Sequence, residues 1–276
     1  MVRVRLMLEI RSISKKFNCG TPNELRALQN VSLTVNDGSF VVIIGTNGSG
    51  KSTLLNAVAG SFFVDCGALS IGGTDITKWP EHRRGKFIGR VFQNPFAGTA
   101  ANMSIAENLA LAAHRGKPRG LRWLLRRHLV GQCRDRISQL NMGLEDRLKN
   151  PIASLSGGQR QAITLLMATW QRPHVLLLDE HTAALDPKSA DQVIALTDSV
   201  IRRDKLTALM VTHSMQQAAN LGDRLIMMHR GCVIQDFQGA EKKRIRVDDL
   251  MARFEEVRRA ELLDESAAEM LRRAYV

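Results

Sequence analysis

A glycine-rich segment at residues 45–52 has the residue types and spacing of a phosphate-binding loop. Its sequence, Gly-Thr-Asn-Gly-Ser-Gly-Lys-Ser, follows the apolar run 40–44 and precedes a helix-forming segment at 53–60. The glycines allow backbone N–H groups to turn inward, where a helix N-terminus and a lysine can also meet negative oxygens. The sequence therefore predicts that ATP or GTP binds at this loop.

The individual positions of this loop have expected roles. Lys51 is expected to reach the β- and γ-phosphates. The Ser52 hydroxyl is expected to hold a Mg²⁺ ion that neutralises charge as the terminal phosphoryl group leaves. Thr53 is expected on the α-phosphate side. The predicted nucleotide-binding residues are Gly45, Thr46, Asn47, Gly48, Ser49, Gly50, Lys51, Ser52 and Thr53.

Two carboxylates, Asp179 and Glu180, follow the continuous apolar run 175–178. A strand buried on both faces is typical of a parallel sheet, whose ligands gather at the carboxyl ends of the strands. Asp179 is therefore expected to hold Mg²⁺, usually through water. Glu180 is expected to polarise an attacking water as a general base.

Two further polar residues follow predicted strands. Gln93 ends the strand 87–92, where it is placed to meet a metal or a water. His213 follows the strand 207–211, where it is placed to contact the γ-phosphate and to orient Glu180 or the water. Each residue alone also fits a simpler interpretation, a solvated glutamine and a structural histidine.

The segment 155–161, Leu-Ser-Gly-Gly-Gln-Arg-Gln, is predicted to begin a helix that runs to about Trp170. A serine followed by two glycines exposes N–H donors at the positive end of the helix dipole, which makes a second candidate anion site. A simple helix cap has a similar sequence. The sequence motif alone does not explain why the chain would have a second anion-binding helix N-terminus.

The N-terminal part predicts an antiparallel β-layer in front of the nucleotide core. Residues 8–14 and 31–35 alternate in polarity as strands do, and residues 36–39 supply a turn. Phe17, just after the first of these strands, has two interpretations. It stacks on the adenine base, or it is a core aromatic residue.

Residues from about 98 to 148 have a helical pattern with two apolar stripes. The stripes comprise Met103, Ile105, Leu109 and Leu111, and then Leu121, Leu124, Leu125, Leu129 and Ile137. Between Arg115 and Arg136, eight basic residues accompany one acidic residue, Asp135. Two interpretations stay open: a surface that meets something anionic, with Trp123 at a lipid interface, or an ordinary solvated helix.

The remaining segments complete an α/β pattern. A helix is predicted over 187–203, and strands over 224–228 and 232–236 close the sheet. A basic run at 242–246 leads into a helical tail, whose apolar stripe comprises Leu250, Phe254, Val257 and Leu262.

Length and composition restrict the class of protein. A chain of 276 residues fits one large α/β domain, or one domain with an insert. No apolar run approaches the roughly 20 residues of a membrane helix, and the start lacks a secretion signal, so a cytosolic location is expected. The four cysteines are widely spaced, which indicates reduced thiols. The net charge of +12 permits nucleic acid, an anionic membrane surface or an acidic protein as partner.

Taken in order, these motifs resemble the ATPase subunit of ATP-binding cassette (ABC) transporters over roughly residues 6–240. The matching features are the Walker A loop 45–52, the Q-loop Gln93, the signature sequence 155–159, the Walker B carboxylates Asp179 and Glu180, the D-loop 184–186 and the switch histidine His213. The resemblance implies an α/β P-loop NTPase fold with a parallel core sheet, an antiparallel β subdomain and an inserted helical subdomain at about 98–165. It implies a nucleotide-binding domain at 1–240 and a helical tail at 241–276.

The resemblance also implies the reason for the second anion site. In this family two cassettes pair head to tail, so that Ser156, Gly157 and Gly158, followed by Gln159, complete the ATP site of the other copy. ATP and Mg²⁺ are the implied cofactors. The implied catalytic residues are Glu180, His213 and Gln93, and the implied metal ligands are Ser52, Gln93 and Asp179.

The implied assembly is a homodimer on the cytoplasmic face of the inner membrane. It powers separate membrane permease subunits, which receive solute from an extracytoplasmic binding protein. His181 stands where the family more often has proline. The sequence of residues 180–187 is similar to the corresponding segment in the ATPases of importers for tryptophan or other aromatic amino acids. An extrusion ATPase and a soluble cassette acting on nucleic acid are the alternatives. A single cassette with a short helical insert favours the importer, and no direct nucleic-acid contact is expected.

Overall fold

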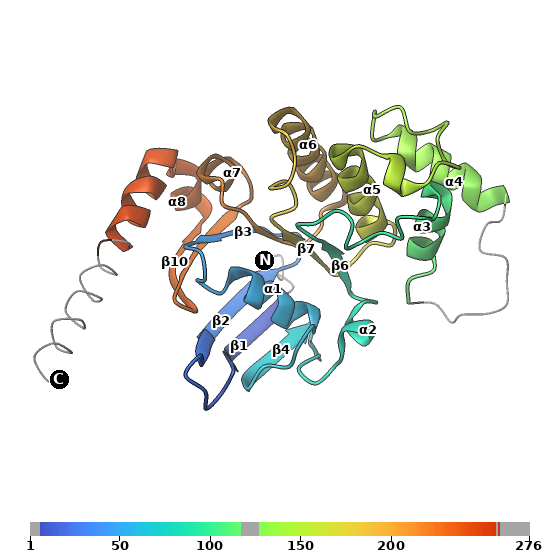
Figure 1. Ribbon diagram of the computed structural model, residues 1–276. Coiled ribbons are helices and arrows are strands. Elements are labelled where there is room, and N and C mark those ends of the chain that lie inside the picture. Colours follow the sequence, from blue (N-terminus) through green and yellow to red (C-terminus); the bar gives the residue numbers. More distant parts are fainter. Residues whose placement is uncertain (1–5, 117–126, 258, 260–276) are drawn as a thin grey trace, which may run out of the picture.

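A six-stranded sheet forms the centre of the computed structural model, which describes residues 6–116, 127–257 and 259 (Figure 1). Its order is β10-β9-β3-β8-β7-β6, and every neighbouring pair is parallel except β10 with β9. The strands are β3 (Phe40–Gly45), β6 (Ile88–Val91), β7 (Val175–Asp179), β8 (Ala208–Val211), β9 (Arg224–His229) and β10 (Cys232–Gln238). The predicted parallel core sheet is therefore confirmed.

A four-stranded antiparallel sheet, with order β2-β1-β4-β5, forms the predicted β-layer. Its strands are β1 (Leu6–Phe17), β2 (Leu25–Asn36), β4 (Cys66–Ile71) and β5 (Thr74–Asp75). The first two are longer than predicted, because the β1–β2 register shifts between Ile10 and Ile13. Ser12, inside this shift, has a left-handed φ of 48°. Such an irregularity interrupts the alternation from which strands are predicted.

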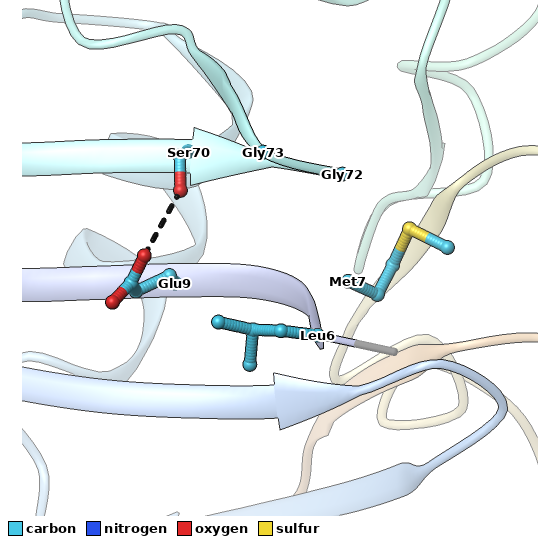
Figure 2. Close-up of a pocket in the computed structure, with 6 residues that line it drawn as sticks. All are labelled: Leu6, Met7, Glu9, Ser70, Gly72 and Gly73. Atoms are coloured by element: carbon cyan, nitrogen blue, oxygen red, sulfur yellow. Dashed lines mark hydrogen bonds between the residues drawn. The ribbon is translucent and has the colours of Figure 1, made fainter. Parts of the chain in front are cut away.

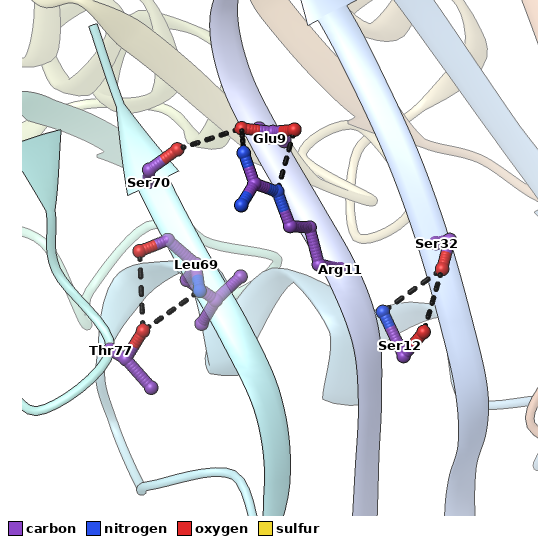
Figure 3. A network of polar contacts seen from close by, with 7 residues as sticks. All are labelled: Glu9, Arg11, Ser12, Ser32, Leu69, Ser70 and Thr77. Atoms are coloured by element: carbon purple, nitrogen blue, oxygen red, sulfur yellow. Dashed lines mark hydrogen bonds and ion pairs between the residues drawn. The ribbon is translucent and has the colours of Figure 1, made fainter. Parts of the chain in front are cut away.

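Polar side chains of the small sheet bond mainly to one another. Arg11 forms an ion pair of 2.7 Å with Glu9, and Ser12 donates its N–H to the Ser32 hydroxyl at 2.9 Å (Figure 3). At one end of β1, a shallow pocket of about 210 Å³ is lined by Leu6, Met7, Glu9, Ser70, Gly72 and Gly73 (Figure 2). These contacts stabilise the sheet and involve none of the predicted site residues.

Helix α1 (Lys51–Ala59) lies between the two sheets (Figure 1). Leu54, Leu55 and Val58 are fully buried in one apolar cluster with residues of β1, β2, β3 and β4. The helix that begins at the phosphate-binding loop is therefore fixed by the core on two sides.

Helix α2 (Glu81–Arg84) lies beside α1, because its Arg84 donates to the Ala57 and Val58 carbonyls. The remaining helices cover the other face of the large sheet or form the insert. They are α3 (Ile105–Ala113), α4 (Arg127–Ser138), α5 (Gly157–Thr169), α6 (Pro187–Asp204), α7 (Met215–Asn220) and α8 (Gly239–Arg244), and residues 247–257 are also helical. Among the described residues, no helix combines the length and hydropathy that crossing a bilayer requires. The four cysteines are free thiols, as predicted.

The apolar stripe predicted for α3 is wrong at Leu111, whose exposed fraction is 45%. A capping box at Ser104 starts the helix at Ile105. From that start, Leu109 and Ala113 share the buried face of Ile105, whereas Leu111 lies on another side. In the second stripe Ile137 is buried and Leu129 partly buried, while Leu121, Leu124 and Leu125 lie outside the described residues.

Two arginines of the basic segment serve the fold. Arg115 donates to the Ala168 carbonyl at 3.1 Å, and Arg136 donates to the Trp170 carbonyl at 2.7 Å. Both carbonyls lie at the C-terminal end of α5, where cations are favourable. These two cations are therefore not a free anion-binding surface. Trp123, the predicted lipid contact, lies outside the described residues.

His181 fixes the chain beyond β7 to α6. Its Nε2 lies 3.0 Å from the Thr197 hydroxyl, which itself donates to the Val193 carbonyl at 2.7 Å. The hydroxyl proton is thus committed to Val193, so His181 Nε2 carries a proton and donates it to Thr197. Burial lowers the pKa of His181 to about 4, so the ring is neutral at neutral pH.

The buried His181 predicts a loss of stability in acid. An unfolded histidine takes up a proton below about pH 6.5, whereas the folded one does so only near pH 4. The free energy of unfolding should therefore fall as the pH drops from about 6.5 to 4. In His181→Asn, which keeps an N–H donor but does not titrate, the loss between pH 7 and 4.5 should be about 2–3 kcal/mol smaller. Denaturant unfolding measures this difference, and equal losses in both proteins would contradict it.

The helix over residues 247–257 packs on the cassette. Leu250 is fully buried in the same apolar cluster as Phe237, with Phe254 and Val257 packed against that cluster. Leu262 lies outside the described residues. The division of the chain at residue 240 stays a prediction.

A pair of leucine substitutions tests this packing. Leu250→Ala should lower the free energy of unfolding by about 2–4 kcal/mol, because it leaves a cavity in the core. Leu111→Ala, on the exposed side of α3, should change it by less than about 1 kcal/mol. Similar values for the two variants in denaturant titrations would show that the C-terminal helix contributes no core packing.

Candidate functional site

Three neighbouring strands, β3, β8 and β7, end at the same edge of the sheet and bring the predicted residues together. Lys51 begins α1 beyond β3, Asp179 ends β7, and His213 lies two residues beyond β8. The strands are paired in the order β3-β8-β7. Residues from distant parts of the sequence therefore form one site.

The predicted phosphate-binding loop is tightly curled around Lys51. The Lys51 ammonium is buried and donates to the carbonyls of Gly45 at 3.0 Å and Thr46 at 2.9 Å. Burial lowers the pKa of Lys51, while the nearby carboxylates of Glu180 and Asp179 act to raise it. A phosphate reaching this amine meets a partly desolvated cation, for which Coulomb attraction is strong.

Two glycines of the loop are required by close backbone approaches. A Cβ on Gly45 would lie 2.2 Å from the Met228 carbonyl oxygen, and one on Gly50 would lie 2.4 Å from the Ala27 carbonyl oxygen. Asn47 and Gly48 are exposed, Gly45, Ser49 and Gly50 are buried, and Thr46, Ser52 and Thr53 are partly buried. The loop thus turns its middle residues toward solvent and its ends into the core.

Ser52 and Asp179 form the predicted metal corner. The Ser52 hydroxyl donates to Oδ1 of Asp179 at 3.0 Å. Hydroxyl and carboxylate oxygens are the ligand types that Mg²⁺ prefers. Gln93 is exposed beyond the end of β6 and shares no hydrogen bond with either residue within the described part of the chain. The structure therefore brings two of the three predicted metal residues into contact.

Sequence reasoning missed Arg90, which lies beside this corner. Its Nη2 is 4.0 Å from Oδ2 of Asp179, and its guanidinium donates to Asn56 and, at 3.1 Å, to Ser61. Burial lowers the pKa of Arg90, and the carboxylates of Asp179 and Glu81 act to raise it. The available signal was an arginine inside an otherwise apolar strand.

The predicted base and the predicted switch histidine are in direct contact. His213 Nε2 lies 2.5 Å from Oε1 of Glu180. Glu180 has a left-handed φ of 45°, and its N–H donates to the Val211 carbonyl at 3.1 Å. The carboxylate is therefore held at the junction of β7 and β8, where it can accept a proton from a water.

The second candidate anion site is a well-formed helix start. Ser156 caps α5, because its hydroxyl accepts from the Gln159 N–H while the Gln159 side chain accepts from the Ser156 N–H, each at 3.3 Å. Ser156 and Gly157 are nevertheless exposed, and neither Ser156 nor Gln159 hydrogen-bonds to the loop 45–52. Because Ser156 and Gly157 stay exposed, this helix start can serve both as a cap and as an anion site.

The glycines of this helix start also allow close packing. A Cβ on Gly157 would lie 2.9 Å from a methyl carbon of Leu185, and one on Gly158 would lie 2.9 Å from Cβ of Ser189. The start of α5 therefore packs directly on the turn that follows Glu180 and on the first turn of α6.

Arg160 and Gln161 link α5 to the segment after β6, a role that the motifs of the sequence do not indicate. Arg160 donates to the Leu155 carbonyl at 3.2 Å and stacks 3.7 Å from the ring centre of Phe96. Gln161 donates to the Phe92 carbonyl at 3.1 Å. The start of α5 and the segment that carries Gln93 are therefore held together.

Phe17 is not a core residue. It is partly exposed and packs edge-on against Phe62, with ring centres 5.3 Å apart. The core interpretation of Phe17 is therefore wrong, and stacking on adenine stays a prediction.

Comparisons with known proteins agree with this arrangement. The ABC transporter family profile matches residues 28–183. The chain is 43% identical to a tyrosine transport ATP-binding protein of Clostridioides difficile (strain R20291), over 90% of this chain and 99% of that protein. It is 36% identical to the lipoprotein-releasing system ATP-binding protein LolD 1 of Caulobacter vibrioides, over 80% of this chain and 92% of that protein.

A solved structure also matches this chain as an ATP-binding cassette. A dimeric ATP-binding cassette in a post-hydrolysis state, bound to ADP and Pi, matches with a TM-score of 0.72 and 25% identity, over 84% of this chain and 98% of its own. Fold, motif order and sequence relatives therefore agree: the chain belongs to the ABC transporter family and is an ATP-binding, ATP-hydrolysing cassette.

Proposed function

We propose that this cassette is the motor subunit of a bacterial importer for tyrosine or a related aromatic amino acid. Two copies close head to tail on ATP at the cytoplasmic face of the membrane and drive separate permease subunits, which an extracytoplasmic binding protein supplies with solute. The observation that carries the proposal is the meeting of Lys51, Asp179, Glu180 and His213 at one sheet edge. The similarity to the tyrosine transport protein supports the cargo.

The residues at this edge fit ATP with Mg²⁺. Ser52 and Asp179 are the oxygen ligands that would hold the ion, which would neutralise negative charge on the β- and γ-phosphates. The Ser49 hydroxyl supports the fit, because it is buried in the loop without a hydrogen-bond partner among the described residues. Gln93 is proposed as a further ligand from the segment after β6.

The chemistry then follows from this chain's own side chains. The Lys51 ammonium and the loop N–H groups bind the terminal phosphate and stabilise the charge that develops on it. Oε1 of Glu180 accepts a proton from the attacking water. His213 positions that carboxylate through the contact at 2.5 Å. Phe17 is proposed to stack on the adenine.

The signature residues support a head-to-tail dimer. Ser156 and Gly157 are exposed at the positive end of α5, and the Ser156 and Gln159 side chains bond within the helical region, away from the loop of their own copy. Ser156, Gly157, Gly158 and Gln159 would therefore meet the phosphate held by the partner's Lys51. The dimeric solved cassette supports this arrangement.

Two exposed apolar side chains support a permease surface near the insert. Phe96 is 50% exposed on the segment after Gln93, and Leu111 is 45% exposed on α3. Arg160 joins the Phe96 segment to the start of α5, so a force on this surface reaches the signature residues. We place the permease contact here.

Blocking hydrolysis should reveal the dimer. Glu180→Gln should lower the hydrolysis rate by about 10²–10⁴-fold, because it removes a general base, and should leave ATP binding intact. Light scattering of this variant should show a dimer with Mg-ATP and a monomer without it. Adding Ser156→Arg, which places a bulky side chain at the exposed cap, should abolish the dimer. A dimer that persists in the double variant would contradict the head-to-tail arrangement.

The similarity to a lipoprotein-releasing ATPase supports a second candidate, an extrusion system. Uptake separates the two. Cells that carry Glu180→Gln should take up radiolabelled tyrosine at least about tenfold more slowly, because hydrolysis no longer resets the dimer. A matched change of an exposed carboxylate, Glu256→Gln, should leave uptake normal. Normal tyrosine uptake in Glu180→Gln cells that retain lipoproteins in the inner membrane would favour extrusion.

A further inference from the structure

Arg90 places a positive charge next to the carboxylate of the proposed metal corner. The two oxygens of Asp179 have different neighbours: Oδ1 accepts from Ser52 at 3.0 Å, and Oδ2 lies 4.0 Å from Nη2 of Arg90. Both the Asp179 and the Arg90 side chains are only 14% exposed. Two opposite charges at this distance interact strongly when both are shielded from water.

Arg90 is held in place by groups other than Asp179. It donates to the Asn56 side chain on α1 and to the Ser61 hydroxyl at 3.1 Å, and its guanidinium carbon lies 4.4 Å from the ring centre of Phe92. Its Nη1 also lies 3.8 Å from Oε1 of Glu81, whose side chain is 56% exposed, so that water screens this pair more than the pair with Asp179. A separation of 4.0 Å from Asp179 is too long for a hydrogen bond. Asp179 therefore experiences Arg90 as a fixed charge, and not as a hydrogen-bond donor that orients it.

This distinction decides the sign of the effect on a metal ion. Removing an orienting donor would weaken metal binding, whereas removing a fixed positive charge strengthens it. Since Ser52 supplies the hydrogen bond to Asp179 and Arg90 supplies only charge, the electrostatic effect is the larger one.

We propose that Arg90 weakens the hold of this site on Mg²⁺ by partly neutralising Asp179. The inference rests on the proposed role of Asp179 as a metal ligand. Arg90 thus acts through Asp179 and sets how strongly the bound nucleotide depends on the metal.

A second buried arginine provides a matched control. Arg84 is also buried and also bonds to α1, through the carbonyls of Ala57 at 2.6 Å and Val58 at 2.9 Å. It forms no ion pair with Asp179 among the described residues. Substituting Arg84 therefore disturbs the same helix without changing the charge that faces Asp179.

The test compares the affinity for the slowly hydrolysed analogue ATPγS in Mg²⁺ and in EDTA, measured by calorimetry on the full chain. The ratio of the two affinities should rise about threefold to tenfold in Arg90→Gln. It should stay at the wild-type value in Arg90→Lys, which keeps the charge, and in Arg84→Gln. An unchanged or lower ratio in Arg90→Gln would overturn the proposal.

A second variant serves if Arg90→Gln does not fold. Asn56→Asp places a negative charge on the group that accepts from Arg90, so it offsets the arginine without removing it, and it should raise the ratio in the same direction. An unchanged ratio in this variant would likewise overturn the proposal.

Asp179→Asn separates this proposal from the proposed function. If it brings the ratio toward one while Arg90→Gln leaves the ratio unchanged, only the role of Arg90 fails. If it keeps the wild-type ratio, Asp179 is not a metal ligand, and the proposed metal corner fails together with the inference.

Discussion

The register of three parallel strands is the constraint on which the site depends. Val211 of β8 pairs with Ile43 of β3 on one side and with Asp179 of β7 on the other. The next residues along each strand therefore leave the sheet together, which brings Glu180 and His213 into contact. A slip by one residue would turn the strand's side chains to the opposite face, so the apolar pairing that fixes the register also fixes the polar site.

Much of the fold and the site could be predicted because the relevant signals are local. Continuous apolar runs gave the parallel strands, and the spacing within residues 45–52 gave the loop and α1. The Ser52–Asp179 and Glu180–His213 contacts followed from placing strand ends at one edge.

What could not be predicted depends on neighbours in space. Arg90 meets Asp179 and Asn56 only because β6, β7 and α1 pack together. An arginine inside an apolar strand indicates a buried charge, but the sequence does not tell which carboxylate that charge faces. The full length of β1 was hidden because its register shift breaks the alternation. Leu111 was misplaced because the helix start at Ser104 decides which side of α3 is buried.

Helix α5 belongs to two cores at once. Leu165 and Ala168 pack in the cluster under the large sheet, and Ile163 packs in the cluster of the helical insert. Gln161 bonds to the end of the segment that leads to Gln93. Helix α5 therefore connects the insert to the sheet, and a displacement of the insert that carries α5 with it also moves the signature residues at the start of this helix.

The left-handed backbone at Glu180 sets the stability of the fold against the proposed chemistry. A glutamate at a φ of 45° is in a conformation that glycine or asparagine adopts more cheaply. The proposed general base is thus held in a backbone conformation that costs stability. Glycine or asparagine at this position would relieve that cost and would remove the carboxylate that contacts His213. Stability and the proposed chemistry therefore make opposite demands on this one position.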